Sequence, residues 1–358
     1  MPAPAKGASL ASLPNDVIFD ILSWTPLKSV CRFRCVSRGW SALISDPVFV
    51  AAHRSHAGPH LLLVANSSYE GKQGRDLRLV DMHRNVVKVI KEVGIYSAFC
   101  PSFDDPVCVT FDACGTNVID LATGKVLMTS PNWRRHVYSY SFGFGRAIPS
   151  GMYKAVRFEN HAVNGHPQMA ACEVLTMADG TATWRATRSH APFLVHGRFA
   201  ATVNGALHFL STSTYHDDYV LRFDLESEEW KHAIKGPLMA DDGVWKNKKI
   251  TQLNGTLCMM GSQPQVLGLT RTHIWLMTDY DKEIWVKTYS ISTALDISDM
   301  MLLGVIRGKL LFCCYGSYGL DKTLQFYDPC TDAFTFAMEM PFKPTGQVGL
   351  CSLHLKGV

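Results

Sequence analysis

The chain has 358 residues and a formal net charge of +4, with 47% hydrophobic and 18% charged residues. That length accommodates a small N-terminal module and one large domain with its own core. No apolar run approaches the roughly twenty residues of a membrane-spanning helix, and the basic residues are too dispersed to line a nucleic-acid groove. We therefore expect neither a membrane nor a nucleic acid among its partners.

The cysteines and the first residues bear on the cellular compartment. Eleven cysteines are scattered along the chain without a C-x-x-C pair, which favours reduced thiols in a core over a metal or redox motif. The segment MPAPAKGASLASLPND at the start carries one lysine and no apolar stretch of secretory length. These features predict an intracellular protein, in the cytoplasm or the nucleus.

The start of the chain predicts three short helices. The first is expected from Pro14 to Ser23, where apolar residues recur at helical spacing behind a proline that suits the first turn. A second covers 27–36, and Ser37 can cap a third that ends before Asp46-Pro47. Helices this short cannot bury all their apolar surface among themselves. Part of that surface must face either the remainder of the chain or another protein.

The stretch 13–49 resembles a plant F-box without a gap. It has the leading Leu-Pro pair, the Ile21-Leu22 pair that closes the first helix, a Pro-x-Lys-Ser entry at 26–29, the run Arg-Phe-Arg-Cys-Val-Ser at 32–37, and Trp40. The resemblance implies docking onto the small Skp-type adaptor of a cullin-based ubiquitin ligase. The residues that it places at the adaptor are Leu13, Pro14, Ile18, Ile21, Leu22, Leu27, Val30 and Val36.

From His60 onward, the sequence repeats with a period near fifty residues. The turn glycines Gly205, Gly255 and Gly308 are 50 and 53 residues apart, and each is followed by similar strand signals and a late aromatic residue. Such a period is typical of a kelch-like propeller, in which every blade is a four-stranded sheet. Weaker copies between 60 and 187 bring the predicted number of blades to six.

These signals define an α+β chain with two domains, a three-helix F-box domain at 10–56 and an all-β propeller at 60–358. The C-terminal segment 346–358 is expected to pair into the first blade, which would cover an open strand edge. Within the propeller, 142–145 and 153–157 resemble part of the F-box-associated interaction domain of plant F-box proteins. The resemblance implies that this domain binds other proteins.

The motifs of common catalytic and cofactor sites are not found in the sequence. There is no GxSxG elbow, the Gly143-Phe144-Gly145 fragment lacks the third glycine of a phosphate-binding loop, and His53, His56 and His60 have no further ligand at metal-binding spacing. We therefore expect no catalytic residue, no cofactor and no metal, and a protein that is not an enzyme. The alternative is a kelch-like propeller enzyme or cofactor-binding protein with a helical arm, with ligands that converge on the propeller axis.

Strand direction predicts where a target would bind. In the strong repeats the turns after the first and third strands are tight, and because antiparallel strands alternate in direction, these turns share one face of the propeller. The longer loops, at 211–218, 236–249, 261–272, 292–299 and 315–322, lie on the opposite face, where loops on a rigid scaffold commonly carry recognition. Tyrosine, tryptophan and arginine are enriched at binding hot spots. The target-binding residues predicted on this face are Tyr215, Trp245, Arg271, Tyr315 and Tyr318.

The sequence therefore predicts a non-catalytic adaptor, the substrate-recognition subunit of an SCF-type (Skp–cullin–F-box) E3 ubiquitin ligase. Its F-box would bind the Skp-type adaptor and, through it, a cullin scaffold. Its propeller would present an unidentified target protein for ubiquitination. The chain would contribute proximity, while other subunits catalyse the transfer.

Overall fold

The computed structural model describes most of the chain in two compact units, residues 1–59 and 60–358. The described residues are 13–25, 27–46, 48–49, 52–53, 60–65, 76–91, 93, 96–100, 106–111, 115–121, 123–130, 140–159, 162–163, 166–167, 171–177, 183–187, 191–192, 195–212, 218–237, 246–264, 269–293, 297–316, 322–339 and 348–352. Over these ranges, no helix has the length and apolar character needed to span a membrane.

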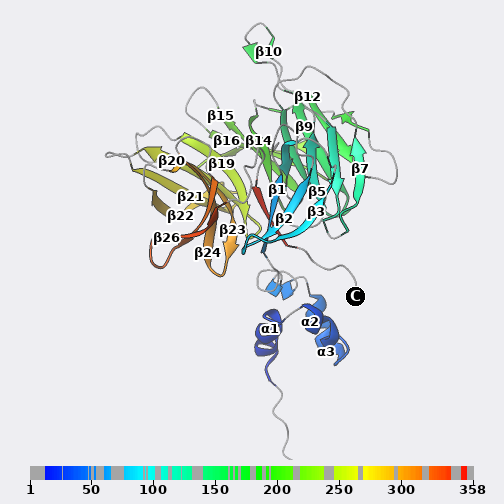
Figure 1. Cartoon of the computed structure of the whole chain (residues 1–358). Helices are drawn as coiled ribbons and strands as arrows, with labels where there is room; N and C mark the ends of the chain where they lie inside the picture. Colours follow the sequence, from blue (N-terminus) through cyan, green and yellow to red (C-terminus); the bar gives the residue numbers. More distant parts are fainter. Residues whose placement is uncertain are drawn as a thin grey trace, which may run out of the picture. The chain divides into compact units, whose positions relative to one another are not determined.

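The N-terminal unit contains helices α1 (Asn15–Ser23), α2 (Leu27–Phe33) and α3 (Arg38–Ser45) (Figure 1). As predicted, the Ser37 hydroxyl caps α3 by accepting a hydrogen bond from the Trp40 amide at 3.1 Å, and the backbone becomes extended at Asp46, ahead of a proline. The second helix is shorter than predicted. The amides of Cys35 and Val36 donate to carbonyls three residues back, so residues 34–36 form a turn instead of continuing α2.

A small core holds these helices together. Leu22 of α1 and Val30 of α2 are each 2% exposed, and they pack with Ile44 and Phe49. The rings of Phe19 and Phe49 meet edge to face with centroids 5.3 Å apart. Side chains that cover this core in part are Ile18, Phe19, Phe33, Trp40 and Leu43. The core uses one face of α1 and leaves the opposite face outside.

The second unit is a β-propeller that includes four four-stranded antiparallel sheets. The first sheet contains β1 (His60–Ala65), β2 (Leu77–Asp81), β3 (Val86–Ile90) and β27 (Val348–Ser352), and the second contains β4 (Tyr96–Cys100), β5 (Val107–Phe111), β6 (Gly115–Ile119) and β7 (Val126–Ser130). The other two contain β19 (Lys246–Leu253), β20 (Thr256–Pro264), β21 (Thr270–Asp279) and β22 (Ile284–Thr293), and then β23 (Ile297–Ile306), β24 (Lys309–Gly316), β25 (Lys322–Asp328) and β26 (Ala333–Glu339).

A fifth, nine-stranded sheet lies between the second and third of these in chain order. Its strands are β8 (Tyr140–Arg146), β9 (Tyr153–Glu159), β12 (Ala171–Thr176), β13 (Arg185–Ala186), β14 (His196–Val203), β15 (Ala206–Thr212), β16 (Asp218–Asp224), β17 (Glu229–Trp230) and β18 (Ile234–Lys235). A short hairpin of β10 (Ala162–Val163) and β11 (His166–Pro167) stands apart from it.

The nine-stranded sheet corrects the predicted number of blades. We predicted six separate four-stranded blades, but over the described ranges the sheets of four or more strands number five, because β8 and β14 pair in parallel at Phe142 and Phe199. Two glycines of β8 permit this approach. A Cβ on Gly143 would lie 2.7 Å from Leu207 Cδ1, and one on Gly145 would lie 2.5 Å from a Thr202 methyl group. The glycine-rich stretch is therefore a packing device.

The propeller is closed both by strand pairing and by packing between its first and last sheets. As predicted, the C-terminal strand β27 joins the first sheet by antiparallel pairing with β1, for example Leu61 opposite Cys351 (Figure 1). The first sheet also packs through Leu79 on the β4–β7 sheet and through Val80 on the β23–β26 sheet. Apolar clusters of the same kind join the intervening neighbours, so the sheets form a ring.

Candidate functional site

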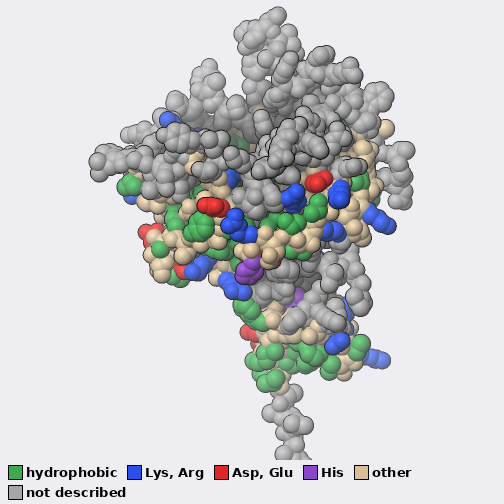
Figure 2. All heavy atoms as spheres, in the orientation of Figure 1, with side chains coloured by type: hydrophobic (Ala, Val, Ile, Leu, Met, Phe, Trp, Pro, Cys, Tyr) green, Lys and Arg blue, Asp and Glu red, His purple; other side chains and the backbone are tan. Residues whose placement is uncertain are grey.

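An apolar stripe runs along the exposed side of α1. It is made of Leu13, Val17, Ile21 and Trp24, which we call the α1 stripe. Val17, Ile21 and the C-cap residue Trp24 follow one another at intervals of four and three, so they share one side of a helix with 3.6 residues per turn, and Leu13 lies just before the N-cap Pro14. Ile21 is 55% and Trp24 63% exposed. Figure 2 shows apolar side chains gathered on this unit. A contiguous exposed apolar surface of this kind marks an interaction site.

The residues that were predicted to contact an adaptor fall into an exposed group and a buried group in the structure. Those that lie exposed are Leu13, Pro14, Ile21 and Val36, and Ile18 is half-buried. Leu22 and Val30 belong to the core of the unit and offer almost no surface to a partner. The side chain of Leu27 lies outside the described residues. Sequence reasoning left out Val17 and Trp24, although their spacing from Leu13 and Ile21 could have identified them.

In the propeller, five turns between third and fourth strands share one design. Each begins with an aspartate whose carboxylate accepts hydrogen bonds from backbone amides two to four residues later. These aspartates are Asp81, Asp120, Asp224, Asp279 and Asp328. A residue near the end of each turn has a φ between 51° and 78°, in the left-handed region. Those residues are Arg84, Gly124, Glu228, Glu283 and Asp332.

Two-residue turns join the first and second strands of the strong repeats. They are Asn204-Gly205, Asn254-Gly255 and Arg307-Gly308, and both residues of each pair have positive φ, as tight hairpin turns require. As predicted, these turns and the aspartate turns follow alternate strands, so within each sheet they lie at the same end. We call this end the short-turn face.

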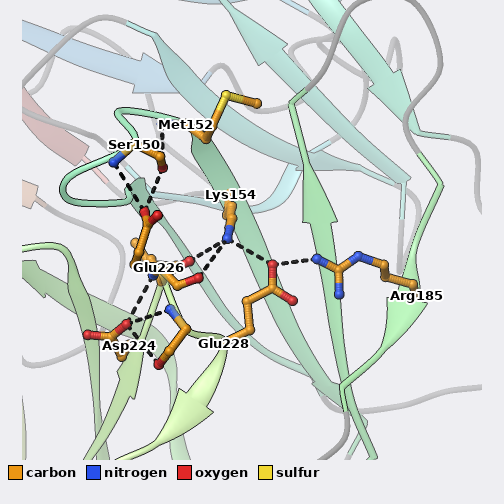
Figure 3. A network of polar contacts seen from close by, with 9 residues as sticks. Ser150, Met152, Lys154, Arg185, Asp224, Glu226 and Glu228 are labelled. Atoms are coloured by element: carbon orange, nitrogen blue, oxygen red, sulfur yellow. Dashed lines mark hydrogen bonds and ion pairs between the residues drawn. The ribbon is translucent and has the colours of Figure 1, made fainter.

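A polar network fixes one turn of the short-turn face (Figure 3). Lys154 of β9 pairs with Glu228 at 2.8 Å, and Arg185 of β13 pairs with the same carboxylate. The Ser150 hydroxyl donates to Glu226 at 2.6 Å. The network therefore ties the β16–β17 turn to strands on the other side of the β8–β14 junction.

The electrostatics of this network indicate a structural role. Partial burial opposes the charge on Glu228, but the hydrogen bonds from Arg185 and Lys154 outweigh it and hold the pKa of this carboxyl below its usual value. Glu228 is consequently ionised at neutral pH and engaged by two cations. A carboxylate held in this way anchors a turn and is poorly suited to act as a base.

The structure describes two of the five residues predicted to bind a target. Arg271 is exposed on β21, and Tyr315 is half-buried on β24. Tyr215, Trp245 and Tyr318 lie outside the described residues. The two described residues belong to different sheets of the propeller.

The predicted loops around Arg271 and Tyr315 are too long. Both residues lie in strands, because pairing continues to Gln263 opposite Arg271 and to Tyr315 opposite Lys322. For the same reason β19 begins at Lys246, within the loop predicted at 236–249. Strand pairing with distant segments extends these elements beyond their local sequence signals.

Two ammonium groups lie close to the ring of Tyr315. The Nζ atoms of Lys322 and Lys249 are 5.0 and 5.8 Å from its ring centroid, and Lys249 also pairs with Asp299 at 2.5 Å. Burial raises the pKa of Tyr315 and lowers that of Lys322. Sequence reasoning missed both lysines and Asp299, because strand register places Asp299 and Lys322 opposite the tyrosine and only the packing of two sheets brings Lys249 to it.

The cysteine thiols and the potential metal ligands form no reactive or metal-binding site among the described residues. The cysteines that the structure describes form no disulfide bond, and Cys108, Cys172, Cys258, Cys313 and Cys314 are buried. Burial raises the pKa of Cys258 to about 12 and that of Cys313 to about 11, which suppresses thiolate chemistry. Across the described ranges, no group of three or more His, Cys, Asp or Glu side chains could hold a metal ion.

A helical unit with an exposed apolar stripe, followed by a closed propeller, defines a two-unit protein with a helical module and a β-propeller. Comparison with known families agrees with this class. Residues 10–51 match the F-box domain, and 78–339 match the F-box associated beta propeller domain. The chain belongs to the family of plant F-box proteins that carry an F-box associated β-propeller.

Curated relatives from Arabidopsis thaliana match over most of the length of this chain. F-box protein At3g07870 is 27% identical over 321 residues, covering 81% of this chain and 75% of its own length. F-box protein At5g10340 is 26% identical over 355 residues, covering 88% of this chain and 76% of its own length. F-box protein At3g57590 is 25% identical over 319 residues, covering 84% of this chain and 78% of its own length. The similarity therefore extends over at least four fifths of this chain in each of the three relatives.

Proposed function

We propose that this protein is the substrate receptor of an SCF-type E3 ubiquitin ligase, acting in the cytoplasm or the nucleus. The F-box domain at 10–56 binds a Skp-type adaptor and, through it, a cullin scaffold. The propeller domain at 60–358 binds the target protein. Other subunits catalyse ubiquitin transfer, and this chain holds the target close to them. The F-box match and the relatives named as F-box proteins support this role.

The observation that carries the adaptor part of the proposal is the α1 stripe. The helical unit has its own core, yet it leaves Val17, Ile21 and Trp24 outside. Burying a large apolar side chain contributes about 1.5 to 3 kcal/mol. An adaptor that covers the stripe would therefore gain a large part of its binding free energy from these side chains.

A double variant tests this docking mode. Val17→Ala with Ile21→Ala removes two exposed side chains and leaves the core intact, so folding is retained. The loss of about 3 kcal/mol or more predicts at least a hundredfold weaker affinity for a purified Skp-type adaptor. Isothermal titration calorimetry with the full-length protein measures it. Unchanged affinity would contradict docking through the α1 stripe.

A matched control is available in the propeller. Val86 and Val87 on β3 are 42% and 51% exposed, close to the exposure of the two stripe residues. Val86→Ala with Val87→Ala removes the same kind of apolar surface from the other unit. Adaptor affinity should remain at the wild-type value. An equal loss in this control would mean that the adaptor also contacts the propeller.

For the target we propose the propeller face opposite the short-turn face. Alanine at Trp245, Arg271 and Tyr318 should abolish capture of the target while adaptor affinity and melting temperature are kept. Lys282→Ala on the short-turn face serves as the control. The target itself can be isolated with the Val17→Ala, Ile21→Ala variant, which would hold it without delivering it for degradation. Loss of capture in Lys282→Ala alone would reverse the assignment of faces.

Metal analysis tests the competing class of protein. A propeller enzyme with a metal on its axis would contain copper or zinc in a stoichiometric amount after purification of the full-length protein. Such a content would contradict a role limited to adaptor and receptor.

A further inference from the structure

Three polar side chains meet where the β14–β18 strands pack against the next sheet. His208 on β15 stands directly opposite Arg222 on β16. Tyr280, in the turn after β21, covers both of them. Its ring centroid is 5.8 Å from that of His208 and 5.6 Å from Arg222 Cζ. We call this cluster the His208 seam.

The His208 seam contains polar atoms without hydrogen-bond partners. His208 is 1% exposed, and its Nε2 atom, Arg222 Nε and the Tyr280 hydroxyl are all buried and unpaired. Each such atom costs about 1 to 3 kcal/mol if nothing satisfies it. Three such atoms in one cluster offer hydrogen-bonding capacity that a bound molecule can use.

The charged side chains around the seam pair with one another and leave Arg222 out. Lys231 pairs with Glu229 at 3.4 Å and Lys282 with Asp279 at 3.5 Å, and His232 lies 3.3 Å from Glu283. Among the described residues, no carboxylate forms a salt bridge with Arg222, whose side chain is half-buried. Within the described part of the chain, the Arg222 guanidinium therefore lies against the Tyr280 ring and has no carboxylate beside it.

The other strong repeats show that the fold does not need polar groups here. The positions of His208 and Arg222 are occupied by Cys258 and Leu276 in one repeat. In the next they are occupied by Leu311 and Phe326, which pack with Met82 in an apolar cluster. Only one of the three equivalent seams has exchanged apolar packing for a histidine, an arginine and a tyrosine.

The hydrogen-bonding capacity of the three groups defines the ligand. His208 Nδ1 lies 3.4 Å from the Ala201 carbonyl, which assigns the ring proton to Nδ1 and leaves Nε2 as an acceptor. Burial and the charge of Arg222 lower the pKa of His208 to about 4, so the ring is neutral at neutral pH. Arg222 Nε can only donate, and the Tyr280 hydroxyl can do both. The ligand must accept from a cation and donate to an imidazole.

A phosphate group fits this combination. With a second pKa of about 6, a phosphate near neutral pH carries negative charge and acceptor oxygens, and part of the population retains an O–H donor. Carboxylate and sulfate ions supply acceptors only. We propose that the His208 seam binds a phosphate group, with Arg222 and Tyr280 donating to its oxygens and His208 Nε2 accepting from its hydroxyl.

Titration of the full-length protein with inorganic phosphate tests the site. Phosphate should bind saturably and raise the melting temperature, whereas sulfate and acetate at equal ionic strength should bind more weakly. Arg222→Leu, which copies Leu276 of the neighbouring repeat, should weaken phosphate binding by roughly tenfold or more, because charge-assisted hydrogen bonds are the strongest available there. Tyr280→Phe removes one hydroxyl and should weaken it by a smaller factor.

Controls separate a built site from nonspecific salt effects. Lys282→Ala removes an exposed cation from the same turn as Tyr280 and should leave phosphate binding unchanged. Equal effects of phosphate and sulfate, or an unchanged response in Arg222→Leu with the fold intact, would mean an adventitious ion only and would overturn the proposal. Phenyl phosphate then identifies the source. Tighter binding than inorganic phosphate indicates a phosphorylated side chain, and weaker binding indicates the free ion. These measurements need no adaptor or target, so they are independent of the proposed ligase function.

Discussion

The helical unit and the propeller handle apolar surface in opposite ways. The helical unit buries Leu22 and Val30 in a small core and leaves Ile21 and Trp24 outside on the same helix. The propeller packs each sheet on its neighbours around a ring and covers its first sheet with its last strand. The difference is that the propeller buries its apolar faces within itself, whereas the helical unit leaves an apolar surface of the kind that interaction sites have.

The largest expected effect separates the two faces of α1. Leu22→Ala should lower the unfolding free energy of the helical unit by about 2 to 5 kcal/mol, because it opens a cavity in a core with few side chains. Ile21→Ala, at the next position, should change it by no more than about 0.5 kcal/mol. Thermal melts followed by circular dichroism measure both. Similar losses in the two variants would mean that α1 has no distinct buried face.

A second variant tests how tightly the propeller is packed at the β8–β14 junction. The added methyl group of Gly145→Ala would lie 2.5 Å from Thr202 Cγ2 and 3.0 Å from Leu225 Cδ1. Overpacking of this kind costs about 1 to 3 kcal/mol. Denaturant unfolding of the full-length protein, with the propeller transition monitored by tryptophan fluorescence, measures the loss. Wild-type stability would show that the junction is loose.

The same substitution in the helical unit should act in the opposite direction. Gly39 lies in α3, and the nearest atom to a methyl group added there would be Ser37 Oγ at 3.8 Å. Gly39→Ala should therefore stabilise the helical unit by about 0.5 to 1 kcal/mol through helix propensity. A higher midpoint in the helical transition is the expected result. Destabilisation would reveal a contact at this position that is absent from the described core.

The smallest expected effect is a change in the pH dependence of thermal stability. The pKa of Glu228 is lower in the folded protein than its ordinary value of 4.5, so its ion pairs add stability above that pH and lose it as the pH falls through the folded pKa. Glu228→Gln should therefore lower the melting temperature near neutral pH, and the gap from the wild type should close on acidification. A gap of constant size across the pH series would argue against the ion pairs as its cause.

The local parts of this structure could be predicted from the sequence. Ser37 and the Asp46-Pro47 pair define α3 because capping and proline geometry act over a few residues. The turns at Gly205, Gly255 and Gly308 follow from glycine in hairpin positions. These signals were sufficient to place the F-box and the repeated strands.

Features that depend on distant segments could not be predicted. Ile21 and Leu22 are adjacent and both apolar, so the sequence alone does not tell which of them is buried. Packing against α2 and α3 buries Leu22 and leaves Ile21 exposed. The ends of β21 and β24 depend on partner strands, so Arg271 and Tyr315 were predicted in loops. Gly143 and Gly145 indicate a close backbone approach, but the sequence does not say that β14 is the partner.

The pairing of β27 with β1 has a consequence for biosynthesis. Strand β27 is the last of the described strands to leave the ribosome, and until it does, one edge of β1 has no neighbour and the ring stays open. Helices α1 to α3 emerge before the strands, and the described residues of their core all lie between 18 and 49. A premature stop codon just before Val348 would thus give a product with intact F-box helices and an open propeller. Under the proposed function, that product would compete with the full-length protein for the adaptor while presenting no target.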